Sequence, residues 1–326
     1  MKLATLKSDG RDGRLVVVAR DLTRAVSADG IAATMQDALE RWSEVEAPLR
    51  ALFNRLQADE AEGAFDFDPT QALAPLPRAW QWLDGSAYKS HGALMDKVFG
   101  MDPPKTDRPL MYQGVSDQFL SATADVPMRN AEEGIDFEGE FGIIVDEVPM
   151  GTAPADAMRH IRLIVQINDW SLRKLAPIEM KTGFGWIQAK PPCSAAPVAV
   201  TPDELGAAWA DGRVHLPLNV WWNEAKFGAA LGGAMGHGFH ELVAHAAHSR
   251  RLVAGTIIGS GTVSNENYRE VGSSCIAERR GIEIEDQGEP KTPFMAFGDR
   301  VRMEVTLGDG TPVFGKIDQQ VVEAAP

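Results

Sequence analysis

Alternating carboxylates run directly into an apolar segment near the middle of this chain. In DFEGE (136–140) an acid occupies every second position, and FGIIV (141–145) follows without a break. Because alternate side chains of a strand share one face, we expect Asp136, Glu138 and Glu140 to lie together. Like charges placed so close repel one another, so this face needs a group of opposite charge.

Two interpretations of these acids stay open from the motif alone. A hard divalent cation favours several carboxylate oxygens as ligands, which fits Mg²⁺, Ca²⁺ or Mn²⁺. Alternatively, the acids line the solvent-facing edge of an antiparallel sheet and meet nearby Lys or Arg side chains.

Composition narrows the class of protein. The 326 residues are 44% hydrophobic and 24% charged, as expected for a soluble globular protein that buries a substantial core. A formal charge of -14 argues against partners such as nucleic acid or an anionic membrane. The two cysteines, Cys193 and Cys275, are too few for a disulfide framework, so we expect a cytoplasmic protein. No segment approaches about 18 consecutive apolar residues, so no membrane span is expected.

The order of apolar and turn-forming segments predicts a mixed α+β fold that is mostly β. Residues 2–8 and 14–20 flank the turn-rich DGRDG and predict a hairpin, and apolar residues at helical spacing predict a helix over 35–56 that continues around Pro48. The proline-rich segment 59–79 is interpreted as a linker. We therefore expect a small α+β domain over 1–75 and a larger, mostly β catalytic domain over 76–326.

Further acids stand at the ends of apolar runs. Asp169 follows IRLIVQI, where a buried strand holds a side chain rigidly, although an Asx turn or a helix N-cap is the alternative. Asp84 and His91 belong to WLDGSAYKSH (82–91), where the motif alone favours a turn residue beside Gly85 for Asp84 and a surface histidine for His91.

Two other motifs receive structural interpretations. HGFHELVAHAAHSR (237–250) carries four histidines, but their spacings of 3, 5 and 3 do not stack them on one helix face. We interpret it as an amphipathic helix that packs Phe239, Leu242 and Val243 inward. GTIIGSGTVS (255–264) is a glycine-spaced strand and turn whose amides can approach a small anion, or else a tight β-corner.

Taken in order along the chain, these motifs resemble the fumarylacetoacetate hydrolase family. The resemblance extends from Trp82 to Gln319 and rests on an Asp seven residues before a His, a Glu-x-Glu strand, an NDWSAR-like motif, a lysine before a turn, a glycine-rich loop and a late Glu. The matching residues are Asp84 and His91, Glu138 and Glu140, Asp169 and Arg173 in NDWSLR, Lys190, Thr262 in GSGTVSN, and Glu278 in SSCIAER.

The resemblance implies a fumarylacetoacetate hydrolase-like β-roll with a small N-terminal domain. It also implies a divalent metal, Mg²⁺ or Ca²⁺ with Mn²⁺ possible, on Asp84, Glu138, Glu140 and Asp169. The implied catalytic residues are His91 as the base, Glu278 as its partner and Lys190, which stabilises developing negative charge unless it is only a counter-ion to the acids. Tyr112, Arg173 and Thr262 are the implied substrate-binding residues.

Some positions that would contact the ends of the substrate depart from the family pattern. A Tyr-His-Gly-Arg sequence of the closest members is Tyr112-Gln113-Gly114-Val115 here, a glutamine is replaced by Ala176, and an expected arginine falls on Gly100. These departures leave the metal ligands and the base in place, so the chemistry is better defined than the substrate.

The expected activity is metal-dependent hydrolysis of a carbon-carbon bond in a 1,3-diketone acid such as fumarylacetoacetate, as in the catabolism of aromatic compounds. The alternatives are an isomerase, a decarboxylase or an acylpyruvate hydrolase that acts on a 2-oxo acid through a metal enolate, and a binding protein that has lost turnover. The resemblance further implies a homodimer.

Overall fold

The carboxylate-rich strand of the sequence lies inside a large mixed sheet, seen in a computed structural model that describes residues 1–99 and 106–325. Ten of its strands follow one path, and two short strands, β13 (Ser194–Ala195) and β5 (Ala72–Leu73), pair with β11 and β1. The path runs through β4 (Phe65–Asp66), β3 (Arg24–Ser27), β2 (Arg14–Val18), β1 (Lys2–Leu6), β14 (Val198–Val200), β11 (Ile161–Asn168), β10 (Gly139–Val145), β19 (Ile257–Gly259), β6 (Trp82–Gly85) and β7 (Met111–Gly114).

A second sheet of five strands packs against the first. Its order is β18 (Ala225–Leu231), β17 (Pro217–Trp222), β20 (Arg300–Thr306), β21 (Pro312–Glu323) and β8 (Val126–Met128). Two short pairs complete the β structure: β9 (Ile135–Asp136) with β12 (Ser171–Leu172), and β15 (Trp209–Ala210) with β16 (Arg213–Val214). The fold is therefore mixed and rich in strands, as predicted.

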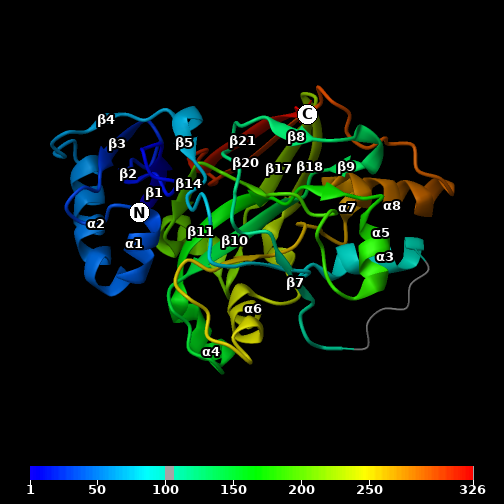
Figure 1. The fold of residues 1–326 in the computed structure, drawn as a ribbon, viewed down its shortest axis with the longest axis horizontal. Helices are drawn as coiled ribbons and strands as arrows, with labels where there is room; N and C mark the ends of the chain where they lie inside the picture. Colours follow the sequence, from blue (N-terminus) through cyan, green and yellow to red (C-terminus); the bar gives the residue numbers. More distant parts are fainter. Residues whose placement is uncertain (100–105, 326) are drawn as a thin grey trace.

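The helices are short apart from three. The α-helices of the described residues are α1 (Met35–Glu40), α2 (Trp42–Gln57), α3 (Lys89–Phe99), α4 (Pro154–Ala157), α5 (Ala176–Thr182), α6 (Phe239–Ala246), α7 (Tyr268–Val271) and α8 (Ile276–Gln287), of which α2, α3 and α8 are the long ones. Figure 1 shows α1 and α2 at the blue N-terminal end of the molecule, and α3, α5 and α8 grouped at the opposite end. No helix in the described part of the chain has both the length and the apolar character needed to cross a membrane.

Strand β10 is buried on both faces, which explains its uninterrupted apolar sequence. Phe141 belongs to the core between the two sheets, where its ring centroid lies 6.2 Å from that of Phe314. Ile144 points the other way into a second core with Leu163 and with Trp42 of α2. Each such large side chain contributes roughly 1.5–3 kcal/mol on burial, so both cores hold this strand in place.

The N-terminal segment departs from the sequence prediction in two places. The expected hairpin of β1 and β2 is confirmed, but the single helix over 35–56 is wrong, because α1 and α2 are separated at Arg41, whose φ and ψ are -117° and 28°. Pro48 is accommodated inside α2. The segment expected as a linker, 59–79, contributes β4 and β5, which pair with β3 and β1.

The main sheet continues across the N-terminal and later parts of the chain. Strand β1 pairs in antiparallel fashion with β14, with Leu3 opposite Ala199. The strands that follow, β11, β10, β19 and β6, are neighbours in the same sheet. This order brings the ends of β6, β10 and β11 together, where the acids of the sequence motifs lie.

Candidate metal and catalytic site

Three buried carboxylates converge at one end of the main sheet. Asp84 lies on β6, Glu140 on β10 and Asp169 directly after β11, and one oxygen of each lies within 4.8 Å of the others. Their exposed fractions are 6%, 0% and 0%. The solvent-facing alternative for the acidic strand is therefore wrong, because these acids are enclosed by the fold.

The donor set of this group suits a hard divalent cation. Neither oxygen of Glu140 accepts a hydrogen bond from any described residue, although both are buried. A buried polar atom without a partner costs free energy, and a carboxylate in this position costs more. A cation with oxygen ligands would remove this cost, so Asp84, Glu140 and Asp169 fit Mg²⁺, Ca²⁺ or Mn²⁺.

The electrostatics of the group agree with this interpretation. Burial, and next the charge of Asp169, raise the pKa of Asp84 to about 8. Burial and the nearby charges of Asp84 and Asp169 raise the pKa of Glu140 well above its ordinary value. Without a cation Asp84 therefore holds a proton at neutral pH, and a divalent ion would take the place of that proton.

Glu138, the fourth expected ligand, lies beside the group but contacts two cations of the chain. Its Oε1 lies 2.5 Å from Nη2 of Arg173, and its Oε2 lies 3.2 Å from Nζ of Lys190. Burial alone would raise the pKa of Glu138, but Arg173 and Lys190 together hold it well below its usual range. The expectation that acids of this strand pair with Lys and Arg side chains therefore holds for Glu138, although Glu138 is buried.

Lys190 and Tyr112 both donate to the same oxygen of Asp169. The Nζ of Lys190 lies 2.5 Å from Oδ2, and the Tyr112 hydroxyl lies 2.6 Å from it. Cys193 donates its thiol to the other oxygen, Oδ1, at 2.9 Å. The turn and N-cap interpretation of Asp169 is therefore wrong, because its side chain contacts distant residues.

The expected base and its partner face each other across two helices. His91 on α3 places Nδ1 3.9 Å from Oε1 of Glu278, which lies in the first turn of α8. Glu278 is fully buried and accepts a hydrogen bond from the Ser264 hydroxyl, and Ser264 in turn contacts Ser90. The His91 side chain is 16% exposed, so it stands between the buried acid and solvent.

Of the expected substrate-binding residues, only Tyr112 contacts the carboxylate group. Arg173 donates through Nε to Asp136, at 2.7 Å, as well as pairing with Glu138. Thr262 is 4% exposed, next to Gly261, whose amide donates to Oδ1 of Asp84 at 3.0 Å. The glycine-spaced turn therefore brings a backbone amide to an anion of the chain itself.

Several contacting residues escaped the sequence analysis. Asp136 was expected beside Glu138 and Glu140 on one strand, but it lies on β9, separate from β10, and accepts from the amides of Ile276 and Ala277 at the start of α8, at 2.7 and 2.9 Å. Asn168 accepts from the amide of Glu138, and Ser171 donates to its carboxylate, both at 2.9 Å. The alternation of acids pointed to Asp136, whereas Cys193, Asn168 and Ser171 gave no signal of their own.

Three of the positions that depart from the family pattern lie in the described part of the chain. Gln113 and Val115 lie on and just after β7, and Ala176 begins α5. Gly100 lies outside the described residues. The histidine segment forms α6 and buries Phe239, Leu242 and Val243, as predicted.

Comparisons with known proteins identify the family. The family models described as "Fumarylacetoacetate (FAA) hydrolase C-terminal" and "Fumarylacetoacetase N-terminal domain 2" match residues 81–322 and 1–78. No curated protein sequence matches this chain significantly.

Solved structures of similar fold cover the chain almost completely. A fumarylacetoacetate hydrolase from the psychrophile Exiguobacterium antarcticum has a TM-score of 0.68 at 18% identity over 99% of both chains. A maleylpyruvate hydrolase from Sphingobium sp. SYK-6, solved with manganese(II) and pyruvate, has a TM-score of 0.67 at 17% identity over 100% of both. A 5-carboxymethyl-2-hydroxymuconate delta-isomerase from Mycobacterium smegmatis has a TM-score of 0.62 at 17% identity over 100% of both. With family models that together match nearly its whole length, the chain belongs to the fumarylacetoacetate hydrolase family.

Proposed function

We propose that this protein is a metal-dependent hydrolase that cleaves a carbon-carbon bond in a 1,3-diketone acid such as fumarylacetoacetate. The observation that carries the proposal is the buried group of Asp84, Glu140 and Asp169 together with a partly exposed base, His91, whose charge acts on the adjacent Glu138. Solved relatives of similar fold are named as hydrolases of such acids, which supports the same reaction class here.

Asp84, Glu140 and Asp169 would hold the divalent cation, and Glu138 would join them if one of its two cationic partners moved away. When bound, the cation would chelate the two oxygens of the 1,3-dicarbonyl and polarise the carbonyl that is attacked. The remaining steps belong to side chains of the chain itself.

His91 would act as the general base. It takes a proton from a water molecule, and the oxygen of that water forms a bond to the attacked carbonyl carbon. Glu278 lies too far away for a direct hydrogen bond at 3.9 Å, but its second oxygen accepts no bond from a described residue. A small rotation of the imidazole would let Glu278 orient His91 and stabilise its protonated form.

Lys190 would stabilise the charge that develops as the carbon-carbon bond breaks. Burial alone would lower the pKa of Lys190, but Asp169 and Glu138 hold it well above its usual range, so the ammonium group keeps its charge. The electron pair of the broken bond passes to the leaving carbon as an enolate, beside a fixed positive charge. The proton that His91 took from water then passes to that carbon, which completes the products and restores the neutral imidazole.

The contacts at the site assign different roles to the three expected substrate-binding residues. Tyr112 lies beside Lys190, whose Nζ is 5.3 Å from the centre of the ring, and its hydroxyl is our candidate for a contact to the substrate. Arg173 is better assigned as a positioning residue that holds Glu138, and Thr262 as a backbone neighbour of the Asp84 contact.

A second candidate is an acylpyruvate hydrolase, isomerase or decarboxylase that acts on a 2-oxo acid through an enolate. The 3.9 Å separation of His91 and Glu278 favours the isomerase and the decarboxylase, since proton transfer without water attack does not need a tightly coupled pair. A relative of similar fold is also named as an isomerase.

We also propose a homodimer in the cytoplasm. Apolar side chains on α5 and the segment after it are exposed, with exposed fractions of 64% for Ile178, 97% for Phe184 and 84% for Ile187. A patch of this kind is typical of a surface that a second subunit covers. Light scattering during size-exclusion chromatography would give the mass of the assembly, and a monomer would contradict this proposal.

The test of the function is the loss of the diketone absorbance in the ultraviolet. The consumption of fumarylacetoacetate and of a short acylpyruvate is measured in the presence of Mg²⁺ or Mn²⁺ and in the presence of EDTA. The same measurements are made on the His91→Ala variant. We expect metal-dependent loss that the variant slows by about 10²-fold or more. His237→Ala, on the segment before α6, is the matched control and keeps full activity.

The outcomes separate the candidates. Loss of the acylpyruvate alone supports the second candidate, as does decarboxylation of oxaloacetate that survives in His91→Ala. If the metal-loaded protein consumes neither diketone nor oxaloacetate, the hydrolase and decarboxylase proposals are both refuted.

A further inference from the structure

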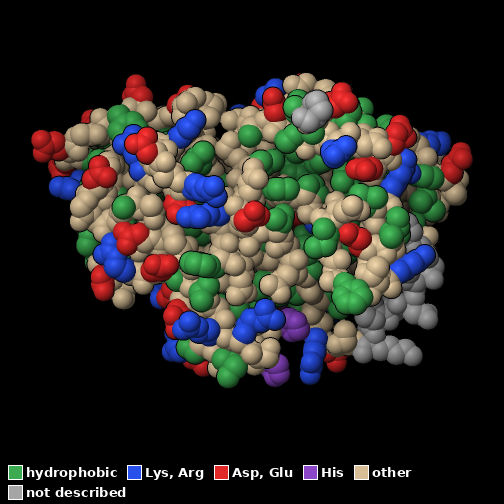
Figure 2. Space-filling view, viewed as in Figure 1, with side chains coloured by type: hydrophobic (Ala, Val, Ile, Leu, Met, Phe, Trp, Pro, Cys, Tyr) green, Lys and Arg blue, Asp and Glu red, His purple; other side chains and the backbone are tan. Residues whose placement is uncertain are grey.

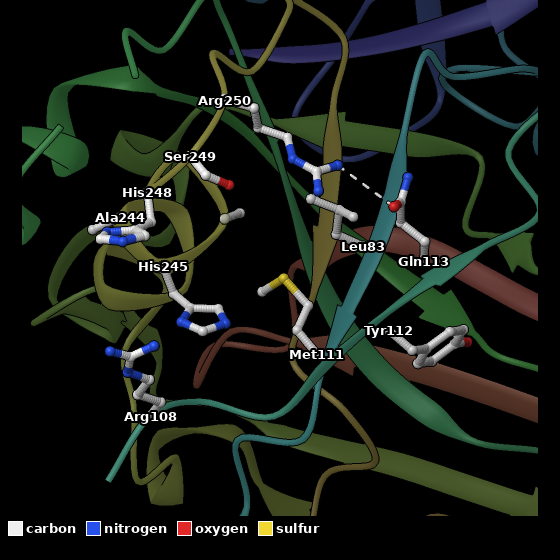
Figure 3. Close-up of a pocket in the computed structure, with 11 residues that line it drawn as sticks. Leu83, Arg108, Met111, Tyr112, Gln113, Ala244, His245, His248, Ser249 and Arg250 are labelled. Atoms are coloured by element: carbon white, nitrogen blue, oxygen red, sulfur yellow. Dashed lines mark hydrogen bonds between the residues drawn. The ribbon is translucent and has the colours of Figure 1, made fainter. Parts of the chain in front are cut away.

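A cavity of about 420 Å³ lies between β7 and the C-terminal end of α6 (Figure 3). Leu83 and Met111 form its apolar wall. Basic side chains enter it from three segments: Arg108 from the approach to β7, His245 from α6, and His248 and Arg250 from the segment after α6.

The charge of this cavity is unbalanced. None of the described residues that line it is acidic. Within residues 1–99 and 106–325, no carboxylate oxygen lies within 4.0 Å of a guanidinium nitrogen of Arg108 or Arg250, and Arg250 contacts only the neutral amide oxygen of Gln113, at 3.5 Å. The chain as a whole carries a formal charge of -14, with 46 acids available to pair with its 32 Lys and Arg residues. Figure 2 shows histidine and Lys or Arg side chains gathered at this lower edge of the molecule.

The pKa of His245 reflects the same excess of positive charge in the cavity. Burial lowers its pKa, and the positive charge of Arg108 and then of His248 and His237 lowers it further. Position at a helix C-terminus favours positive side chains and explains why histidines occur at the end of α6. It does not explain Arg108 and Arg250, which lie outside that helix and point into the same cavity.

The cavity adjoins the proposed catalytic site at Tyr112, which is among its lining residues, but most of its lining faces the other way. Alternate residues of a strand face opposite sides, so Leu83 and Gln113 face the cavity while Asp84 and Tyr112 face the carboxylate group. In Figure 3 the Tyr112 ring points away from the basic side chains, and its hydroxyl donates to Asp169. The two sites share strands β6 and β7 but occupy opposite faces of them.

We propose that this cavity is a binding site for a small dianion, a phosphate group or a dicarboxylate, held between Arg108 and Arg250. Guanidinium groups bind such oxyanions with two parallel hydrogen bonds, and the apolar wall leaves room for a short carbon chain. The volume falls within the range of about 300–1,000 Å³ that is typical of small-molecule sites. The proposal does not depend on the proposed hydrolase activity.

Equilibrium titration of the full-length protein tests this site. Inorganic phosphate is followed by ³¹P NMR and succinate by saturation-transfer NMR, in chloride-poor buffer. Metal-free protein is used first, because it has no cation at the carboxylate group to which the anion could bind, and the titration is repeated with Mg²⁺ bound. Saturable binding with the same dissociation constant in both forms is expected, since the cavity lies on the other face of the strands.

Matched arginine variants locate the bound anion. Arg108→Gln and Arg250→Gln should each weaken binding by about tenfold, the loss of one charge-assisted contact. Arg251→Gln, which removes the neighbouring arginine that lies 3.8 Å from Glu147, should leave binding unchanged. Arg250→Lys should retain part of the affinity, and circular dichroism confirms that each variant is folded.

The results show whether the cavity binds an anion at all, and whether that anion is a phosphate or a dicarboxylate. Tighter binding of phosphate than of succinate assigns a phosphate-bearing ligand, and the reverse assigns a dicarboxylate. The absence of saturable binding at millimolar concentrations of either anion would overturn the proposal. An equal loss of affinity in Arg251→Gln and Arg250→Gln would also overturn it.

Discussion

Removing one buried acid should change how the stability of the metal-free protein depends on pH. In the folded protein, burial and then the charge of Asp169 raise the pKa of Asp84 from 3.8 to about 8. Between these values the unfolded chain releases a proton that the folded chain keeps. The free energy of unfolding therefore falls as pH rises, by ~1.4 kcal/mol per pH unit for this one group.

The Asp84→Asn variant lacks this titration. Its amide oxygen can still accept the hydrogen bond that the Gly261 amide donates to Asp84. From about pH 5 to about pH 8, the variant should gain about 4 kcal/mol in unfolding free energy relative to the wild-type protein. Taking the difference between the two proteins cancels the titration of histidines and exposed acids, which both share.

Urea denaturation of chelator-treated protein at several pH values measures this difference. Asp117→Asn, at an exposed position, serves as the control and should show no such trend. Added Mn²⁺ should stabilise the wild-type protein at pH above about 8 and have little effect on Asp84→Asn. A difference between Asp84→Asn and wild type that stays constant with pH would refute the electrostatic account of the site.

Three more outcomes follow from contacts at the site. Metal affinity should fall about tenfold for each pH unit below about 8, because protons compete for Asp84, and titration with a competing metal indicator would show it. Arg173→Met should destabilise the protein by about 3–5 kcal/mol in urea denaturation, since it leaves Glu138 buried with one cation fewer; an unchanged midpoint contradicts this. Gly261→Ala should weaken metal binding, because Gly261 has φ of +78° and an added Cβ would lie 2.3 Å from the carbonyl oxygen of Gly85; calorimetry showing wild-type affinity would count against it.

Local patterns of the sequence predicted much of this molecule. The β1–β2 hairpin and the apolar face of α6 follow from spacing within a few residues. The convergence of Asp84, Glu140 and Asp169 was expected only from the family resemblance, because their strands are 56 and 29 residues apart in sequence and no local rule specifies their order in the sheet.

What the sequence left open depends on tertiary contacts. Nothing in NDWSLR shows that Arg173 turns back to Asp136 and Glu138, since that requires β9 and β12 to pair. The break at Arg41 was missed because the apolar spacing continues through it, while the Arg41 side chain contacts Asp37 and the carbonyl oxygen of Ile31. The basic cavity combines segments whose charges are unremarkable when read one at a time.

The pairing of β1 with β14 affects how this protein can be dissected in the laboratory. Deleting residues 1–75 would leave β14 without a partner on one edge and would uncover Leu163, Val165 and Ile167, which now pack with the N-terminal helices. An exposed strand edge beside an uncovered apolar surface promotes aggregation. A truncated catalytic fragment should therefore be insoluble even though it retains every acid of the site, and loss of activity in such a fragment would say nothing about substrate binding by the N-terminal part.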